Sequence, residues 1–161
     1  MSRAAAALLG AALALGLFGA PAAGASAPPV SAALRAAMPA TQPFPDLTQT
    51  TIRLGGRPLL VVVAQTEAER EAGLRQRATL GPYRGMLFVF QGDSSVGFTM
   101  STVPVALDIG FYGANGRTLD RLRMTPCPHP ESDCPVYEAS HSFRYAVETL
   151  AGRLPRGSLT G

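Results

Sequence analysis

The sequence predicts an α+β fold that is mainly antiparallel β, with about seven short strands in a compact sheet or barrel-like sandwich and one principal helix. Short runs of β-branched, leucine and aromatic residues recur from residue 50 onwards. Turn signals that contain glycine or asparagine separate these runs, and only one segment has strong helix signals. We therefore expect a single domain over residues 49–161.

The first two strands are expected on either side of Gly55-Gly56, as a hairpin. The run TTIRL before the glycines alternates between apolar and polar residues. The run PLLVVVA after them is apolar on both faces, which is typical of a central strand.

The helix is expected to begin at Thr66, in the segment TEAEREAGLRQR. Thr66 and Glu69 have the spacing of a capping box, and acids precede arginines, as the helix dipole favours. Arg70, Leu74 and Arg77 would then share one helix face. The arginines could bind a carboxylate or phosphate there, but we favour the alternative that their stems pack on the sheet and their charges pair with local acids.

The remaining strands are expected where short apolar or alternating runs recur. They are MLFVF, SVGFTMSTV, ALDIGFY, RTLDRLRM and SFRYAVETL. Asn115-Gly116, between the third and fourth of these, predicts a type I′ hairpin turn.

The N-terminus has the features of a secretory signal peptide over residues 1–25. Arg3 precedes an apolar run over residues 4–20, and Ala23-Gly24-Ala25 is a small-x-small cleavage site. The alternative is an uncleaved anchor, although the run is at the short end of what spans a membrane. We expect cleavage after Ala25 and export to the periplasm or the extracellular space.

Residues 26–48 contain five prolines and little periodicity, so we expect a Pro/Ala-rich linker. The formal net charge of the whole chain is only +3 at pH 7, and the charges are scattered, which argues against a nucleic-acid partner. After the signal peptide, the sequence has no further run that is apolar for long enough to span a membrane.

Five segments together resemble domain-of-unknown-function family 192, also called uncharacterised protein family 0127. In chain order they are EREAGLRQR (69–77), RGMLFVF (84–90), FTMSTVPVALDIGFY (98–112), CPVYEAS (134–140) and YAVETLAG (145–152). The resemblance covers about residues 50–160 and implies a compact, mostly β domain that is often exported. It implies no established reaction, substrate or cofactor.

Some positions depart from the usual pattern of that family. Thr99 stands where a tryptophan is common, Ser101 and Thr102 stand where a Lys-Asn pair is common, and Arg75 replaces a frequent methionine. If that aromatic and basic group normally contacts a ligand, this chain binds a different ligand or binds more weakly.

Asp108 and Glu148 are the candidate catalytic residues. Asp108 alternates with Leu107, Ile109 and Phe111, and Glu148 is expected on the strand face opposite Tyr145 and Val147. If their strands were neighbours, the two carboxylates could line one cleft and act as general acid and base, for example in glycoside hydrolysis. The alternative, which we favour, is that each carboxylate accepts hydrogen bonds that fix the sheet.

Met86, Phe98 and Met100 have the spacing of ordinary strand residues, so a β core is favoured over a copper site. Arg70, Arg77, Met86, Phe98, Met100 and Asp108 remain the candidate ligand-binding residues.

Cys127 and Cys134 are expected to form a structural disulfide, because two cysteines of a small exported domain usually pair. Their spacing is not that of a Cys-x-x-Cys redox site. The alternatives are a regulatory role of the two cysteines and zinc bound by both cysteines with His129 and His141, which requires reduced thiols.

We therefore expect a small binding or accessory module of the cell envelope, with no metal, no cofactor and no assignable reaction. Its partner would be a small molecule, a peptide or an envelope polymer. The rival expectation is a hydrolase of an envelope polymer that acts through Asp108 and Glu148.

Overall fold

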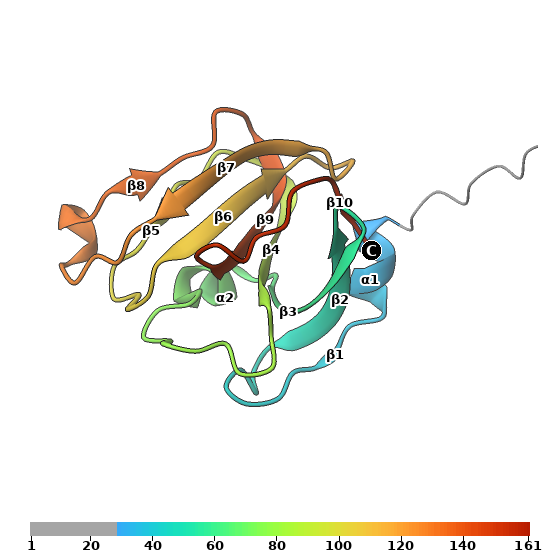
Figure 1. The fold of residues 1–161 in the computed structure, drawn as a ribbon, viewed down its shortest axis with the longest axis horizontal. Coiled ribbons are helices and arrows are strands. Elements are labelled where there is room, and N and C mark those ends of the chain that lie inside the picture. Colours follow the sequence, from blue (N-terminus) through green and yellow to red (C-terminus); the bar gives the residue numbers. More distant parts are fainter. Residues whose placement is uncertain (1–28) are drawn as a thin grey trace, which may run out of the picture.

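Ten strands and two short helices make up residues 29–161, the part of the chain that the computed structural model describes (Figure 1). The helices are α1 (Val30–Arg35) and α2 (Glu67–Ala72), and a 3-10 turn, η1, spans Glu131–Asp133. The strands are β1 (Met38–Pro39), β2 (Thr48–Leu54), β3 (Arg57–Ala64), β4 (Gly85–Ser94), β5 (Phe98–Thr99), β6 (Leu107–Tyr112), β7 (Thr118–Met124), β8 (Val136–Tyr137), β9 (Phe143–Leu150) and β10 (Leu159–Thr160). The predicted signal peptide lies outside the described residues.

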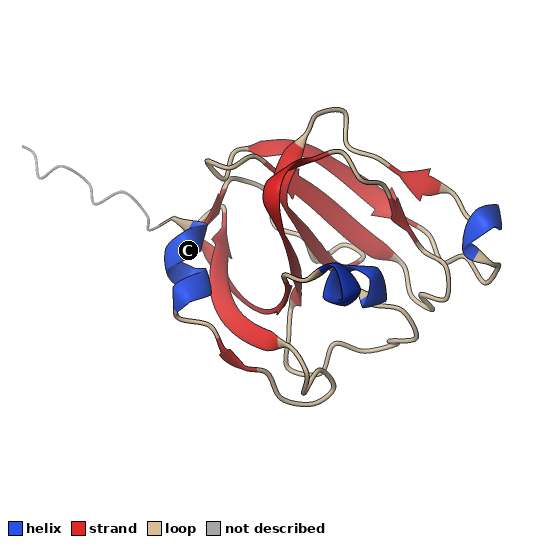
Figure 2. Cartoon of the chain, turned by 180° about the vertical axis from the view of Figure 1, so that it is seen from behind, coloured by secondary structure: helices blue, strands red, loops and turns tan. Residues whose placement is uncertain are grey.

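Eight of the strands form one sheet, in the order β1-β2-β3-β4-β9-β6-β7, with β10 also paired to β2. Every pairing in this sheet is antiparallel except β3 with β4, which the segment containing α2 connects. Figures 1 and 2 show β4 and β9 between a β2–β3 arm and the β6–β7 arm, with α2 beside these central strands. β5 and β8 form a separate two-stranded sheet. The predicted mainly antiparallel, sandwich-like fold is confirmed, and the large sheet is open rather than closed into a barrel.

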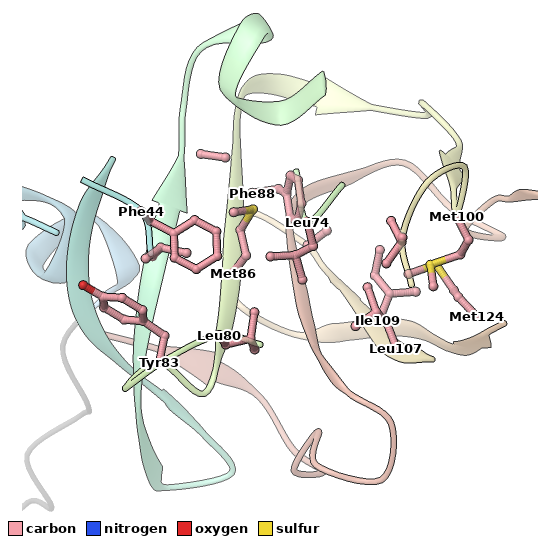
Figure 3. Packing of buried hydrophobic residues seen from close by; sticks show 14 of the residues in the cluster. Phe44, Leu74, Leu80, Tyr83, Met86, Phe88, Met100, Leu107, Ile109 and Met124 are labelled. Carbon is pink, nitrogen blue, oxygen red and sulfur yellow. The ribbon is translucent and has the colours of Figure 1, made fainter. Parts of the chain in front are cut away.

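Two apolar clusters cover the two faces of the large sheet. The α2-side cluster includes Phe44, Val62, Leu74, Met86, Phe88, Met100, Ile109, Phe111, Phe143 and Ala146, several of which are labelled in Figure 3. The α1-side cluster includes Val30, Ile52, Leu54, Val61, Val63, Leu87, Tyr112, Val147 and Leu159. Successive residues of β3, β4 and β9 alternate between the two clusters, because side chains of a strand point to opposite faces. The prediction that β3 is buried on both faces is confirmed.

The helix begins as predicted but ends early. The Thr66 side chain accepts a hydrogen bond from the Glu69 N–H, and the Glu69 carboxylate accepts one from the Thr66 N–H, so the capping box is formed. Gly73 then adopts φ 45° and ends the helix, and Gln76, with φ 58°, donates its N–H to Thr102 O at 2.8 Å. The expectation that Arg70, Leu74 and Arg77 share one helix face is therefore wrong, because only Arg70 is in the helix.

The β6–β7 turn is not the type I′ turn that Asn115-Gly116 predicts. A type I′ turn requires positive φ at both central residues. Here Gly116 has φ 75°, whereas Asn115 is not among the residues with positive φ. Gly116 donates its N–H to Gly113 O at 2.8 Å, and Gly113 donates to Arg117 O at 3.0 Å. The hairpin is thus longer than a two-residue loop, with one left-handed glycine at its end.

The segment SVGFTMSTV forms a much shorter strand than expected. Phe98 and Thr99 pair with Tyr137 and Val136 respectively, and beyond them Ser101 makes only an isolated bridge with Cys127. Thr102 adopts φ 60°, which turns the chain away from an extended strand. The following loop still buries Met100 and Val103 in the α2-side cluster.

Residues 29–48 are packed on the domain, so the linker expectation is wrong for this segment. Val30 and Phe44 are buried, at 4% and 3% exposure. α1 lies beside β2 (Figure 1), and Thr50 Oγ1 of β2 donates a hydrogen bond to Ala33 O of α1 at 2.8 Å. The prolines conceal the usual periodicity, but the isolated apolar residues between them are enough to anchor the segment. No helix within residues 29–161 has the length and apolar character needed to cross a membrane.

Candidate functional site

A cleft of about 660 Å³ lies between α2, the end of β4, the β4–β5 connection and the disulfide loop. Its apolar lining consists of Leu74, Phe88, Phe90, Val96, Phe98 and Val103. Its charged lining consists of Glu67, Arg70, Glu71, Arg75, Glu131 and Glu148. An apolar wall with a few charged groups is the usual composition of a ligand site.

The aromatic wall of the cleft is held in place by packing from behind. Phe98 meets Phe88 edge to face, with ring centroids 5.2 Å apart, and also contacts Phe111 at 5.7 Å. Phe90 meets Phe143 edge to face at 5.2 Å. These pairs fix the rings that face the cleft, so the wall is largely formed before a ligand arrives.

Glu148 lies at the buried end of this cleft. It is in β9, where it pairs in register with Met86 of β4 on one side and Ile109 of β6 on the other. Its exposure is only 5%, and its carboxyl group makes no hydrogen bond or ion pair with any residue in the range 29–161. Burial disfavours the charged form and raises the pKa of Glu148 to about 8.

The sequence predicts Glu148 on a face opposite the apolar side chains of its strand. It is opposite Val147, but its own face carries Ala146 and is covered by the α2-side cluster. Because β9 is central in the sheet, both of its faces are buried, which alternation along one strand cannot reveal.

Asp108 lies on the other face of the sheet. It pairs in register with Thr149, not Glu148, and it lines a separate cleft of about 430 Å³. Its carboxylate forms an ion pair with Arg123 and accepts the Gly152 N–H at 2.6 Å. Partial burial opposes ionisation of Asp108, but these hydrogen bonds outweigh it and lower the pKa below its usual value. Glu148 is in register with Ile109, the residue after Asp108, so the two carboxylates point to opposite faces of the sheet. The expected two-carboxylate catalytic site is not formed.

Arg70 and Arg77 do not act as a pair. The Arg70 guanidinium lies 4.8 Å from the centre of the Phe90 ring and donates to Val89 O at 3.1 Å. Arg77 lies over Phe44 at 5.0 Å and is not part of the cleft lining. Neither arginine forms an ion pair within the described chain, so the expected pairing with local acids is replaced by aromatic and backbone contacts.

Among the other candidate ligand-binding residues, only Phe98 lines the cleft. Met86 and Met100 are fully buried in the α2-side cluster (Figure 3), as expected for core methionines. The structure therefore brings Arg70, Phe98 and Glu148 together in one cleft and places Arg77, Met86, Met100 and Asp108 outside its lining.

Arg75 and Glu131 are cleft residues that the sequence reasoning did not propose. Arg75 donates to the Glu131 carboxylate at 2.6 Å and to Ser101 O at 3.2 Å, so it joins the end of α2 to the disulfide loop. Its guanidinium also lies 3.5 Å from Thr99 Oγ1. The departures from the family pattern at positions 75, 99 and 101 pointed to this wall, since Arg75 contacts both Thr99 and Ser101.

The predicted disulfide between Cys127 and Cys134 is confirmed, with Cα atoms 5.9 Å apart. Both cysteines are consumed by this bond, so the alternative zinc site is not formed. The bond closes the loop that carries Glu131, and Cys127 is attached to the β5 segment through its N–H to Met100 O at 3.3 Å. The disulfide thus holds one wall of the cleft.

Residues 50–160 match domain-of-unknown-function family 192, described as an uncharacterized ACR. The chain belongs to that family. The family carries no assigned activity, and a search of curated proteins finds no match to this chain.

Two solved structures share the fold of this family member. One, from Novosphingobium aromaticivorans, is a protein of unknown function with 26% identity and a TM-score of 0.62, covering 79% of this chain and 95% of its own. The other, from Sinorhizobium meliloti, is described as a "putative transcription regulator" and has 27% identity and a TM-score of 0.60. It covers 70% of this chain and 93% of its own. Both support the fold of the family domain.

Proposed function

We propose that this protein is an exported binding module of the cell envelope, whose cleft beside α2 binds a small molecule or a peptide. The observation that carries the proposal is Glu148, a nearly buried carboxyl group at the end of an aromatic-lined cleft, which has no hydrogen-bond or ion-pair partner within residues 29–161. Its oxygens receive no donor from residues 29–161, so they are available to a ligand that enters the cleft.

Export is supported by two independent features. The N-terminus has the pattern of a signal peptide, and the disulfide between Cys127 and Cys134 is the kind of bond that persists in oxidising compartments. N-terminal sequencing of the exported protein tests this part of the proposal. We expect a mature chain that begins at Ser26, and a retained Met1 contradicts it.

Binding is favoured over hydrolysis because the two candidate catalytic acids lie on opposite faces of the sheet. A glycosidase needs two carboxyl groups that flank one bond, within about 10 Å of each other and in the same cleft. Asp108, the second acid of that hypothesis, lines a separate cleft, and the further carboxyl groups of the Glu148 cleft, Glu67, Glu71 and Glu131, are exposed.

A ligand screen with a blocked cleft tests the binding function. Thr99 is half-buried in the lining, so Thr99→Trp fills part of the cleft. Val136, in the adjacent strand, is 59% exposed and outside the lining, so Val136→Trp is the matched control. Thermal shift against a library of metabolites and short peptides should find compounds that stabilise the wild type and the control but not Thr99→Trp. Compounds that stabilise all three proteins equally would contradict a function of this cleft.

A further inference from the structure

We propose that the ligand of this cleft is an organic cation, a molecule with an ammonium or guanidinium group on an apolar body, and that Glu148 binds its charged end. This inference rests on the proposed binding function and names its ligand class.

The position of Glu148 provides the first argument. Its neighbours in register, Met86 and Ile109, are fully buried and apolar, so they offer no donor to its carboxyl oxygens. The arginines of the cleft do not supply one either, because Arg70 donates to backbone carbonyls and Arg75 donates to Glu131, Ser101 and Glu71. The donor that the Glu148 oxygens require must therefore come from the ligand or from solvent.

The charge of the whole cleft provides the second argument. Four carboxyl groups and two guanidinium groups line it. The Arg75–Glu131 ion pair at 2.6 Å neutralises one of each. The side chains of Glu67 and Glu71, both in α2, accept no hydrogen bond within the described residues, so their charges remain free at the rim. Arg70 offsets one of these charges and Glu148 is protonated in the free protein, so the cleft keeps an excess of one negative charge, which attracts a cation and repels an anion.

The aromatic wall provides the third argument. Phe88, Phe90 and Phe98 line the cleft and can pack against the apolar body of a ligand. An aromatic face also attracts cations within about 6 Å of its centre. Arg70 already uses Phe90 in this way. A carboxyl group at the end of an aromatic-lined cleft is complementary to an amine on an apolar chain.

A metal ion does not fit the same groups. Hard cations such as Ca²⁺ take about six to eight oxygen ligands. No cluster of three or more His, Cys, Asp or Glu residues that could hold a metal occurs in residues 29–161. A single carboxyl group with phenylalanines around it suits an organic cation instead.

Binding of a cation to Glu148 requires loss of a proton. With a pKa of about 8, Glu148 is mostly protonated at pH 7 in the free protein. A cation binds the ionised form, so the proton leaves to the buffer when the ligand binds. The affinity should therefore rise about tenfold per pH unit from pH 6 to pH 7 and level off above pH 8. The other charged groups that line this cleft are Glu67, Glu71 and Glu131, which are exposed, and Arg70 and Arg75, which are partly buried.

Three matched probes test the ligand class: 2-phenylethylammonium, neutral 2-phenylethanol and anionic phenylacetate. We expect calorimetry at pH 7 to show binding of the ammonium at least tenfold tighter than of the other two. Measurement in buffers of different ionisation enthalpy should show release of about one proton per bound ammonium at pH 7 and almost none at pH 9.

The variant Glu148→Gln keeps the shape of the side chain and removes its charge and its titration. It should lose at least tenfold in affinity for the ammonium and release no proton. Asp46→Asn is the control, because Asp46 is exposed and outside the cleft lining, and it should behave as the wild type. Tighter binding of the alcohol or the phenylacetate, no binding of any probe, or unchanged proton release in Glu148→Gln would each overturn the inference. Stabilisation by a neutral or anionic compound that Thr99→Trp abolishes would overturn the cationic class while supporting the binding function, so the two failures are distinguishable.

Discussion

At the scale of single residues, Glu148 departs most from what its surroundings favour. Its neighbours in register across β4 and β6 are apolar, and the side chains next to it in β9 are Val147 and the buried Thr149. An ionised carboxylate in such surroundings costs several kcal/mol, so the group remains protonated at neutral pH in the free protein. The pKa of Glu148 therefore links the stability of the fold to pH.

The variant Glu148→Gln should change how stability depends on pH. The folded-state pKa of about 8 lies above the usual value of 4.5, so the folded protein holds a proton that the unfolded chain releases. Stability from this group is fully present below pH 4.5 and is lost as pH rises through 8. The wild type should lose on the order of a few kcal/mol of unfolding free energy between pH 5 and pH 8.5 from this group, whereas the variant should not. Urea denaturation at several pH values measures this, and parallel curves for the two proteins would contradict it.

At the scale of elements, glycines set where strands can approach one another. Gly116 ends the β6–β7 hairpin with φ 75°, and a Cβ there would lie 1.9 Å from Leu159 O. Leu159 also donates its N–H to Gly116 O at 2.8 Å. The glycine therefore joins this hairpin to β10, which in turn pairs with β2 at the far end of the large sheet. Gly56, in the β2–β3 turn, has a similar φ of 80° but open space around it.

The variants Gly116→Ala and Gly56→Ala separate these two effects. Gly56→Ala should lower the unfolding free energy by about 1–2 kcal/mol, because a residue with a Cβ is strained in a left-handed backbone conformation. Gly116→Ala should cost at least about 1 kcal/mol more, because strands must move apart to admit the methyl group. Chemical denaturation of both variants gives the comparison. Equal losses would mean that contact with β10 contributes little.

The disulfide is a second element-scale constraint. Replacement of both cysteines by serine should lower the unfolding free energy by roughly 2–3 kcal/mol, since the bond closes a short loop. The prolines already stiffen the unfolded loop, so they reduce the stabilisation that the disulfide adds. The loop holds Glu131 in its ion pair with Arg75. Cys127 O also accepts a hydrogen bond from the Thr102 N–H at 3.2 Å. Hydrogen exchange of the Thr102 amide should therefore accelerate in the double variant. The Val62 amide, in the distant centre of β3, serves as the control and should keep its protection.

Local signals predicted most of the elements but not their assembly. The capping box at Thr66, the Gly55-Gly56 hairpin and the β6, β7 and β9 runs were identifiable because each depends on residues close in sequence. The end of α2 at Gly73 and the brevity of β5 depend on left-handed residues at 73, 76 and 102, of which 76 and 102 are not glycines. For the site, Phe98, Arg70 and Glu148 were named, but their convergence depends on the strand order β4-β9-β6. Periodicity within one strand cannot reveal which strands are neighbours.

At the scale of the whole molecule, the N-terminal segment completes both sides of the sheet. Val30 of α1 enters the α1-side cluster, and Phe44 enters the α2-side cluster, where it stacks edge to face with Tyr83 at 5.9 Å. Thr41 N–H donates to Tyr83 Oη at 2.7 Å. The match to family 192 begins at residue 50, so these contacts come from a part of the chain that precedes the shared domain.

A chain that begins at Thr48 should therefore be much less stable than one that begins at Ser26, although it retains the whole family match. Removal of Phe44 alone leaves a hole in the α2-side cluster, and Phe44→Ala in the longer chain should cost about 3–5 kcal/mol. Met38→Ala is the control, because Met38 is 61% exposed and should change stability little. Thermal unfolding of the two chains and the two variants measures the contribution of the segment. If the chain from Thr48 unfolds at the same temperature as the longer one, residues 29–48 are a dispensable tether, and the burial of Val30 and Phe44 contributes nothing to the fold.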